Sequence, residues 1–143
     1  SASTEIRYEI FLAKRHIEAK DLAVKDGSLD VDGNGQYDAL TDGLLLLRDM
    51  FGLTDTALVG GAVAANADYR TAPALKERIK ALGMLADIDG NGQIDALTDG
   101  LLTLRHLFGL EGDTLISGVV AQDATRDTAE EIEAHLETLM PAM

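Results

Sequence analysis

The chain has no cysteine and no tryptophan, and only two prolines among its 143 residues. Without cysteine it cannot form disulfide bonds, zinc–thiolate sites or a thiol nucleophile. Three tyrosines and three phenylalanines are its only aromatic residues, so its core must be built mainly from leucine, isoleucine, valine and alanine. No apolar run reaches the roughly 18 residues of a membrane-spanning helix, so membrane insertion is not expected.

Positive charge is also scarce, because 12 lysines and arginines stand against 25 acidic residues, for a formal net charge of −13. Such a chain would repel nucleic acids and anionic membrane surfaces, so we expect no nucleic-acid partner. A zinc-protease signature, a phosphate-cradling glycine loop and a nucleophile-elbow motif are all missing, and no catalytic function is predicted. The length and the hydrophobic content of 46% favour one domain, residues 1–143, with a substantial core.

A long internal repeat dominates the sequence. Residues 30–53 return at residues 87–110 with 19 of 24 positions identical, at an offset of 57. A weaker match continues beyond them, where residues 66–75 align with residues 123–132. We therefore predict two duplicated units, residues 27–83 and 84–140, preceded by an N-terminal helix over residues 4–25.

Each unit opens with the motif D-x-D-G-N-G-Q-x-D, which places oxygen-bearing side chains on alternate residues. The first, third and fifth positions offer side-chain oxygens, the following glycine permits a sharp turn, and the glutamine then offers its backbone carbonyl. The three acids of the motif and a fourth that follows four residues later would repel one another without a cation. The motif therefore predicts two sites for a hard divalent cation, with Ca²⁺ favoured because no nitrogen or sulfur ligand lies nearby.

The predicted metal ligands form two equivalent sets of six. They are Asp30, Asp32, Asn34, Gln36, Asp38 and Asp42 in the first unit, and Asp87, Asp89, Asn91, Gln93, Asp95 and Asp99 in the second. The sequence leaves two alternatives for the sixth ligand of each set, because threonine occupies the twelfth loop position and the next acid follows one residue later. Either Asp42 and Asp99 close the coordination shell of a longer loop, or they only cap the next helix and Asp38, Asp95 or water complete it.

Hydrophobic periodicity predicts helices around the loops and no sheet, so the fold class is all-α. A helix is expected over residues 39–51, with Leu40, Leu44, Leu47 and Phe51 on one apolar face and Gly52 as its C-cap. Residues 56–65 and 114–121 predict short helices, and further helices begin near Thr71 and Thr128 and run to about residues 83 and 140. Arg48 and Arg105, at equivalent positions, are expected to pair with an acid or to cap a helix end. Apolar residues at the eighth loop position, Tyr37 and Ile94, suggest a small β bridge between loops lying back to back.

The loop resembles an EF-hand, and the pair of loops followed by leucine-rich stretches is most similar to bacterial dockerin-type calcium repeats. This resemblance covers residues 30–53 and 87–110 and implies a paired helix–calcium loop–helix arrangement, here with extra helices. Two features depart from the family pattern. Threonine replaces the twelfth-position acid, and the spacing of 57 residues exceeds that of dockerin repeats.

The resemblance implies a non-catalytic module with two calcium ions, serving attachment or protein interaction in a secreted or cell-surface bacterial protein. A cohesin-like protein or another domain of the same chain would be the partner. In dockerins the tenth and eleventh loop positions help to select the cohesin, but we assign Leu40 and Leu97 here to the buried helix face. Two alternatives stay open: a calcium-dependent switch that exposes an apolar groove, and a spacer unit of a longer repeat array.

Overall fold

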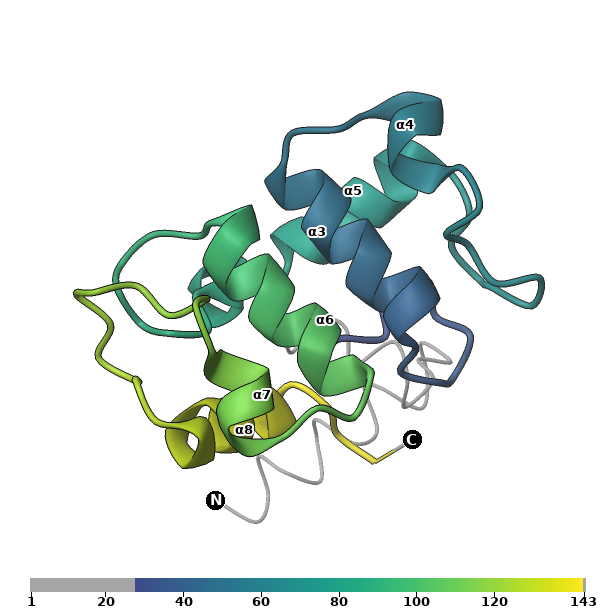
Figure 1. The fold of residues 1–143 in the computed structure, drawn as a ribbon. Coiled ribbons are helices and arrows are strands. Elements are labelled where there is room, and N and C mark those ends of the chain that lie inside the picture. The colour runs from purple at the N-terminus through teal and green to yellow at the C-terminus, as the bar shows by residue number, and fades with distance from the viewer. Residues whose placement is uncertain (1–27, 143) are drawn as a thin grey trace, which may run out of the picture.

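The computed structural model describes residues 28–142, and every regular element among them is helical (Figure 1). The all-α prediction is therefore confirmed for this part of the chain. The predicted N-terminal helix over residues 4–25 lies outside the described residues. None of the described helices is both long enough and apolar enough to span a membrane.

The two repeats carry the same series of helices. In the first, η1 (Ala39–Gly43) runs directly into α3 (Leu44–Met50), and α4 (Asp55–Val59) and α5 (Ala72–Lys80) follow. In the second, η3 (Ala96–Gly100) runs into α6 (Leu101–Leu107), and α7 (Gly112–Ile116) and α8 (Ala129–Thr138) follow. A short 3₁₀ turn, η2 (Gly83–Ala86), precedes the second loop and was not predicted.

Several of these helices begin or end at the capping residues that the sequence predicted. After α3, Gly52 adopts a φ of 83°, and its N–H donates to the carbonyl of Asp49 at 2.8 Å. Thr71 caps α5 by accepting a hydrogen bond from the N–H of Ala74. Thr128 caps α8 within a complete capping box. These ends were predictable because they depend on residues adjacent in sequence.

The short helices α4 and α7 end earlier than predicted, at residues 59 and 116. Glycines that follow them, Gly61 at φ 69° and Gly118 at φ 74°, take backbone conformations that a helix cannot continue. Arg48 donates from Nη1 to the carbonyls of Leu58 and Gly60 at the end of α4. Arg105 makes the equivalent bonds at the end of α7, so of the two expected roles, pairing with an acid or capping a helix end, the structure shows capping.

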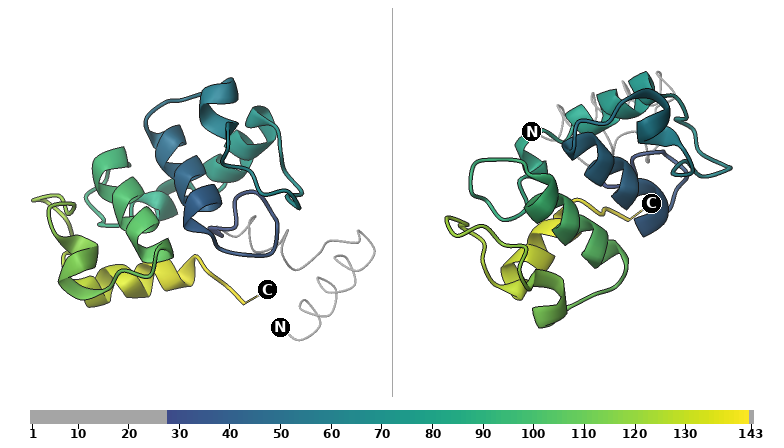
Figure 2. Two further views of the ribbon diagram at one scale, coloured as in Figure 1. Left: turned by 45° about the vertical axis from the view of Figure 1, so that its right-hand side comes forward. Right: turned by 45° about the horizontal axis from the view of Figure 1, so that its top comes forward.

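Contact between the repeats is made chiefly by α3 against η3 and by α6 against η1, and α3 and α6 lie side by side (Figures 1 and 2). Glycines allow the close approach. A Cβ added to Gly43 would lie 2.8 Å from Cδ1 and 3.6 Å from Cα of Leu104 on α6. The reciprocal contact is equally tight, since a Cβ on Gly100 would lie 2.7 Å from Cδ1 and 3.5 Å from Cα of Leu47 on α3. The repeats therefore meet through two equivalent glycine contacts.

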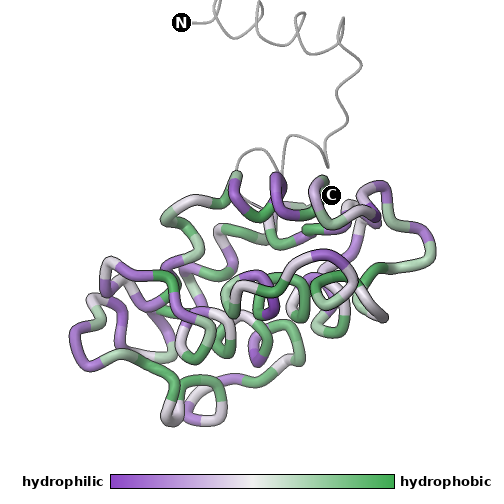
Figure 3. The backbone as a smooth tube through the Cα atoms, turned by 90° about the horizontal axis from the view of Figure 1, so that it is seen from above, coloured by the Kyte–Doolittle hydropathy of each residue, from purple (hydrophilic) through white to green (hydrophobic). Residues whose placement is uncertain are grey.

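Buried apolar residues from both repeats form one cluster, which includes Leu45 and Leu46 of α3 and Leu102 of α6. Hydrophobic segments run through the helical middle of the molecule in Figure 3, and hydrophilic ones through its outer loops. The predicted apolar face of residues 39–51 is only partly correct. Leu45 and Leu46 are the buried residues, whereas Leu40 and Phe51 are 61% and 54% exposed. Leu97 is likewise 63% exposed, so the assignment of Leu40 and Leu97 to the core was wrong. The helix packs on two sides, against its own repeat and against its partner repeat, which a single periodic stripe does not describe.

The predicted β bridge between the loops is also wrong, because residues 28–142 contain no strand or bridge. The Tyr37 hydroxyl instead donates to the carbonyl of Pro141, after α8. Nearby, the N–H of Leu29 donates to the carbonyl of Leu139 at 2.8 Å. Ile94 lines a shallow groove with Met50 of α3 and other residues of the first repeat.

The glycine contact between the repeats can be tested with Gly43→Ile. The added side chain cannot be accommodated by moving one leucine tip, because the backbone of α6 is also close. We expect a loss of about 2 kcal/mol in the free energy of unfolding, measured by urea denaturation. Ala57→Ile, on the exposed side of α4, is the control and should change stability by less than about 0.5 kcal/mol. Equal effects of the two substitutions would contradict close packing at Gly43.

Candidate metal centres

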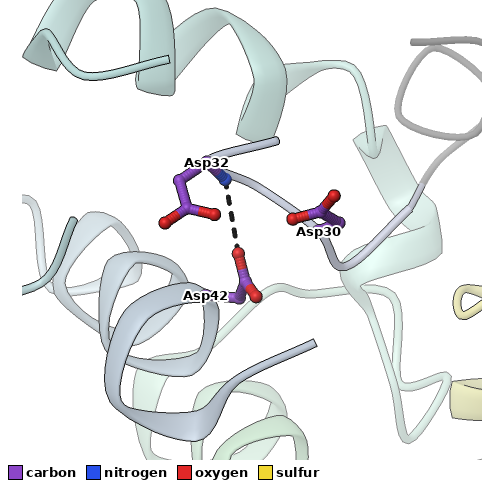
Figure 4. Close-up of side chains that lie close together, drawn as sticks. All are labelled: Asp30, Asp32 and Asp42. Atoms are coloured by element: carbon purple, nitrogen blue, oxygen red, sulfur yellow. Dashed lines mark hydrogen bonds between the residues drawn. The ribbon is translucent and has the colours of Figure 1, made fainter. Parts of the chain in front are cut away.

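Each repeat brings three aspartate side chains together. In the first, Asp30 and Asp32 come from the loop and Asp42 from η1, and Figure 4 shows their carboxylates converging. One carboxylate oxygen from each residue lies within 4.8 Å of the others. All three residues are fully buried, at 0% exposure.

The second repeat reproduces this cluster with Asp87, Asp89 and Asp99, whose oxygens also lie within 4.8 Å of one another. Asp89 and Asp99 are 0% exposed and Asp87 is 5% exposed. Six of the twelve predicted ligands are therefore gathered into two buried groups. Two equivalent, fully buried acidic clusters are unusual, because buried carboxylates normally have a positive partner.

The turn that follows Asp30 shapes the first cluster. Oδ2 of Asp30 accepts a hydrogen bond from the N–H of Gly35 at 3.0 Å, and Gly35 adopts a φ of 85°. Within the turn, Oδ1 of Asn34 accepts from the N–H of Gln36 at 3.1 Å. The second loop makes the same pair of bonds. This turn matches the role that the sequence assigned to the glycine at the sixth position.

Asp42 joins the two ends of its loop. Its Oδ1 accepts hydrogen bonds from the N–H groups of Val31 at 2.8 Å and Asp32 at 3.3 Å, and its Oδ2 accepts from the N–H of Asp38 at 2.9 Å. Asp99 makes the equivalent three bonds in the second repeat. The displaced acid thus does more than cap a helix, because it belongs to the buried cluster and holds the loop closed.

A widened first helical turn brings Asp42 to this position. The N–H of Gly43 donates to the carbonyl of Asp38, five residues earlier, where an α-helix would use a partner four residues earlier. The second repeat has the same bond between Gly100 and Asp95. One extra residue is accommodated in the turn, and the acid at the thirteenth loop position therefore reaches the cluster.

Several carboxylate oxygens in the clusters have no hydrogen-bond donor. Oδ1 of Asp30, Asp32 and Asp89 is buried without any partner in the described structure. A buried unsatisfied polar atom costs on the order of 1–3 kcal/mol, and more when it carries charge. Each belongs to a carboxylate that lies close to two others in its cluster, so a cation is the group that would satisfy them.

Burial raises the pKa of the helix-borne aspartates. Desolvation, followed by the charges of Asp32 and Asp30, raises the pKa of Asp42 to about 8, although backbone N–H donors oppose the shift. Desolvation and the charge of Asp89 raise the pKa of Asp99 to about 6. Burial also raises the pKa of Asp30. Each cluster therefore holds its negative charges at a free-energy cost.

The remaining predicted ligands lie at the rim. The side-chain amide of Asn34 donates to Asn66, and that of Asn91 to Asp123, while Gln36 and Gln93 are exposed. The ninth-position acids, Asp38 and Asp95, do not join the buried groups of three. They serve as the residues before η1 and η3, where their backbone N–H groups bind Asp42 and Asp99.

Sequence reasoning missed a second segment that wraps each loop, which we name the clasp segment: residues 64–69 and 121–126. The N–H of Ala64 donates to Oδ2 of Asp32 at 3.0 Å, and two further N–H groups, of Asp68 and Tyr69, donate to its carbonyl. The second clasp segment binds Asp89 in the same way. The sequence feature that could have revealed the clasp segments is the weaker match of residues 66–75 with 123–132, which extends the repeat beyond the loop.

Comparison with known protein families, with curated proteins and with solved structures finds no match for this chain.

The raised pKa values predict an inverted pH dependence of stability in chelator. The folded state binds protons on Asp42 and Asp99 more tightly than the unfolded chain does. This stabilisation is fully present below about pH 4 and is lost as the pH rises through about 6 and then about 8. Urea denaturation in EDTA should give higher stability at pH 5 than at pH 9. The Asp42→Asn variant should lose the part of this dependence that lies near pH 8, and a wild-type protein that is more stable at pH 9 would contradict the assignment.

Proposed function

We propose that this protein is a non-catalytic calcium-binding module that takes up two ions, one in each aspartate cluster. The buried and unpaired Oδ1 atoms of Asp30, Asp32 and Asp89 are the observation that carries the proposal. Three carboxylates at close range cannot share a buried space as anions without a counter-charge. Calcium would supply that charge and occupy the free lone pairs together.

The donor set favours Ca²⁺ over transition metals. All of the converging side-chain atoms are carboxylate oxygens, and neither cluster includes a histidine or cysteine. Ca²⁺ takes six to eight oxygen ligands in flexible geometries, whereas Mg²⁺ requires a tighter octahedral shell. The Asn34 side chain and the Gln36 carbonyl, with Asn91 and Gln93 in the second repeat, would add oxygens at the rim.

Calcium would act here as a structural ion. Each ion would attract the aspartates of its cluster and offset the repulsion among them. It would thereby stabilise the loop, the π-helical turn that follows it and the clasp segment together. A secreted or cell-surface bacterial protein, as the dockerin resemblance implies, would meet calcium concentrations that saturate modest sites. Dissociation constants of about 10⁻⁴–10⁻³ M would suffice in that setting.

Attachment to a protein partner is the role that the surface favours for this module. Leu97 and Phe51 line one shallow pocket between the repeats, beside Met50 and Ala96. Leu40 and Phe108, at the equivalent repeat positions, are 61% and 54% exposed. Exposed apolar side chains of this size mark interaction surfaces, and Leu40 and Leu97 stand at the eleventh loop position, which helps to select the cohesin partner in dockerins. Since they are already exposed, no opening motion is needed to present them.

A calorimetric calcium titration tests the two-ion proposal. The wild-type protein should bind two ions, and Asp32→Asn and Asp89→Asn should each bind one, because each removes a charge and an unpaired oxygen from one cluster. The stabilisation at a calcium concentration 100 times the dissociation constant should be about 2.7 kcal/mol for each site, as measured by urea denaturation.

Asp113→Asn on the exposed α7 is the matched control and should leave the stoichiometry at two. The proposal fails if the wild-type protein shows the same unfolding curve in calcium and in chelator.

A hydrophobic dye distinguishes the structural role from the calcium switch. If calcium stabilises a surface that is already exposed, fluorescence of the bound dye should change less than about twofold between chelator and saturating calcium at a temperature where both forms are folded. Circular dichroism at the same temperature provides the control for folding. A large calcium-induced rise in dye fluorescence would favour the switch.

A further inference from the structure

A guanidinium group lies against the entrance of each aspartate loop. In the second repeat, Nε of Arg126 donates to the carbonyl oxygen of Ile88 at 2.8 Å, and Nη2 donates to that of Asp87 at 2.6 Å. Arg126 thus bridges the first two backbone carbonyls of the loop. It extends from the same clasp segment whose N–H groups bind Asp89.

Arg78 of α5 makes the matching contacts in the first repeat. Its Nε donates to the carbonyl of Val31 at 2.9 Å and its Nη2 to that of Asp30 at 3.3 Å. Its guanidinium also lies 3.6 Å from the centroid of the Tyr69 ring. Arg78 is 9% exposed, so the contact is made inside the protein.

The two arginines do not occupy equivalent repeat positions. At the offset of 57, Arg78 corresponds to His135 and Arg126 corresponds to Tyr69. The same pair of carbonyls is therefore bridged from α5 in one repeat and from the clasp segment in the other. Simple duplication of a residue does not produce this arrangement, which indicates that the loop itself requires a guanidinium at this place.

The direction of these hydrogen bonds suits a cation site. An arginine beside three buried aspartates would ordinarily bind the carboxylates and compete with a metal ion. Within residues 28–142, no ion pair joins Arg126 to the carboxylates of its cluster, and its guanidinium donates instead to two backbone carbonyls. The loop backbone is held while Oδ1 of Asp89 stays unpaired.

We propose that Arg78 and Arg126 are positioning residues of the two cation sites. Each arginine holds the backbone of the first and second loop positions with the rigid fork of its guanidinium, and thereby orients the buried aspartates toward the ion. The inference rests on the proposed calcium binding and adds that geometry, rather than the positive charge of the arginine, determines affinity. A second layer of contacts that orients metal ligands commonly contributes 10–100-fold to affinity.

The test uses the full chain with Asp32→Asn, which leaves only the second site to be titrated with Ca²⁺. Adding Arg126→Lys keeps the charge and removes the fork, and should weaken calcium binding at least about tenfold. Adding Arg126→Met removes both and should weaken binding as much or more. Arg105→Lys is the matched control, because Arg105 also donates to several carbonyls, at the C-terminal end of α7, and none of these belongs to the metal loop. It should change affinity less than about twofold.

Three results separate the possibilities. Unchanged affinity with Arg126→Lys overturns the positioning role, and stronger binding with Arg126→Met would show that the arginine acts only as a repelling charge. Arg126→Lys in the Asp89→Asn background should leave the first site unchanged, whereas equal weakening there would indicate general destabilisation. If the parent variants bind no calcium at all, the proposed function fails instead, and the two failures are distinguishable.

A rescue experiment in the first repeat tests the proposal even if the Arg126→Lys variant does not fold. In the Asp89→Asn background, which reports the first site, Arg78→His should weaken calcium binding at least about tenfold. Adding Tyr69→Arg rebuilds in the first repeat the pair of residues that the second repeat carries, and should restore at least half of the lost binding free energy. Weakened binding that the second change does not improve would overturn the inference.

Discussion

Mutual repulsion among three buried carboxylates is the constraint on which the rest of each repeat depends. Asp30, Asp32 and Asp42 are held together against that repulsion by backbone N–H groups from the loop and the clasp segment. These donors offset part of the charge, yet three Oδ1 atoms across the two clusters keep no partner. The surrounding structure is therefore arranged around a positive charge that the protein does not itself place among the carboxylates.

The same constraint connects the clusters to the contact between the repeats. Asp42 is followed directly by Gly43, which packs on Leu104 of the other repeat, and Asp99 is followed by Gly100, which packs on Leu47. In each repeat, the aspartate that holds the loop closed is thus adjacent in sequence to the glycine that packs against the other repeat. The widened turn of η1 serves both purposes, because it points the carboxylate toward the loop and leaves the glycine toward the neighbouring helix.

Much of the local structure followed from residue patterns. The glycine turn in the loop, the capping box at Thr128 and the end of α3 at Gly52 were all predictable, since each depends on residues within a few positions of one another. The burial of Leu45 and the exposure of Leu40 were not. A helix that packs against two neighbours does not bury one stripe, and periodicity alone cannot identify the second neighbour.

The sequence by itself determined the all-α class, the duplicated loops and the pairing of Asp30 with Asp32 and of Asp87 with Asp89, because these depend on composition and short-range spacing. Only the tertiary structure decided that Asp42 and Asp99 join the clusters, that residues 64–69 and 121–126 wrap the loops, and that two non-equivalent arginines bridge the same carbonyls. These contacts join residues far apart in the chain or depend on one extra residue in a helical turn. Spacing along the sequence does not directly encode the long-range contacts or the widened turn, since both are set by how the helices pack.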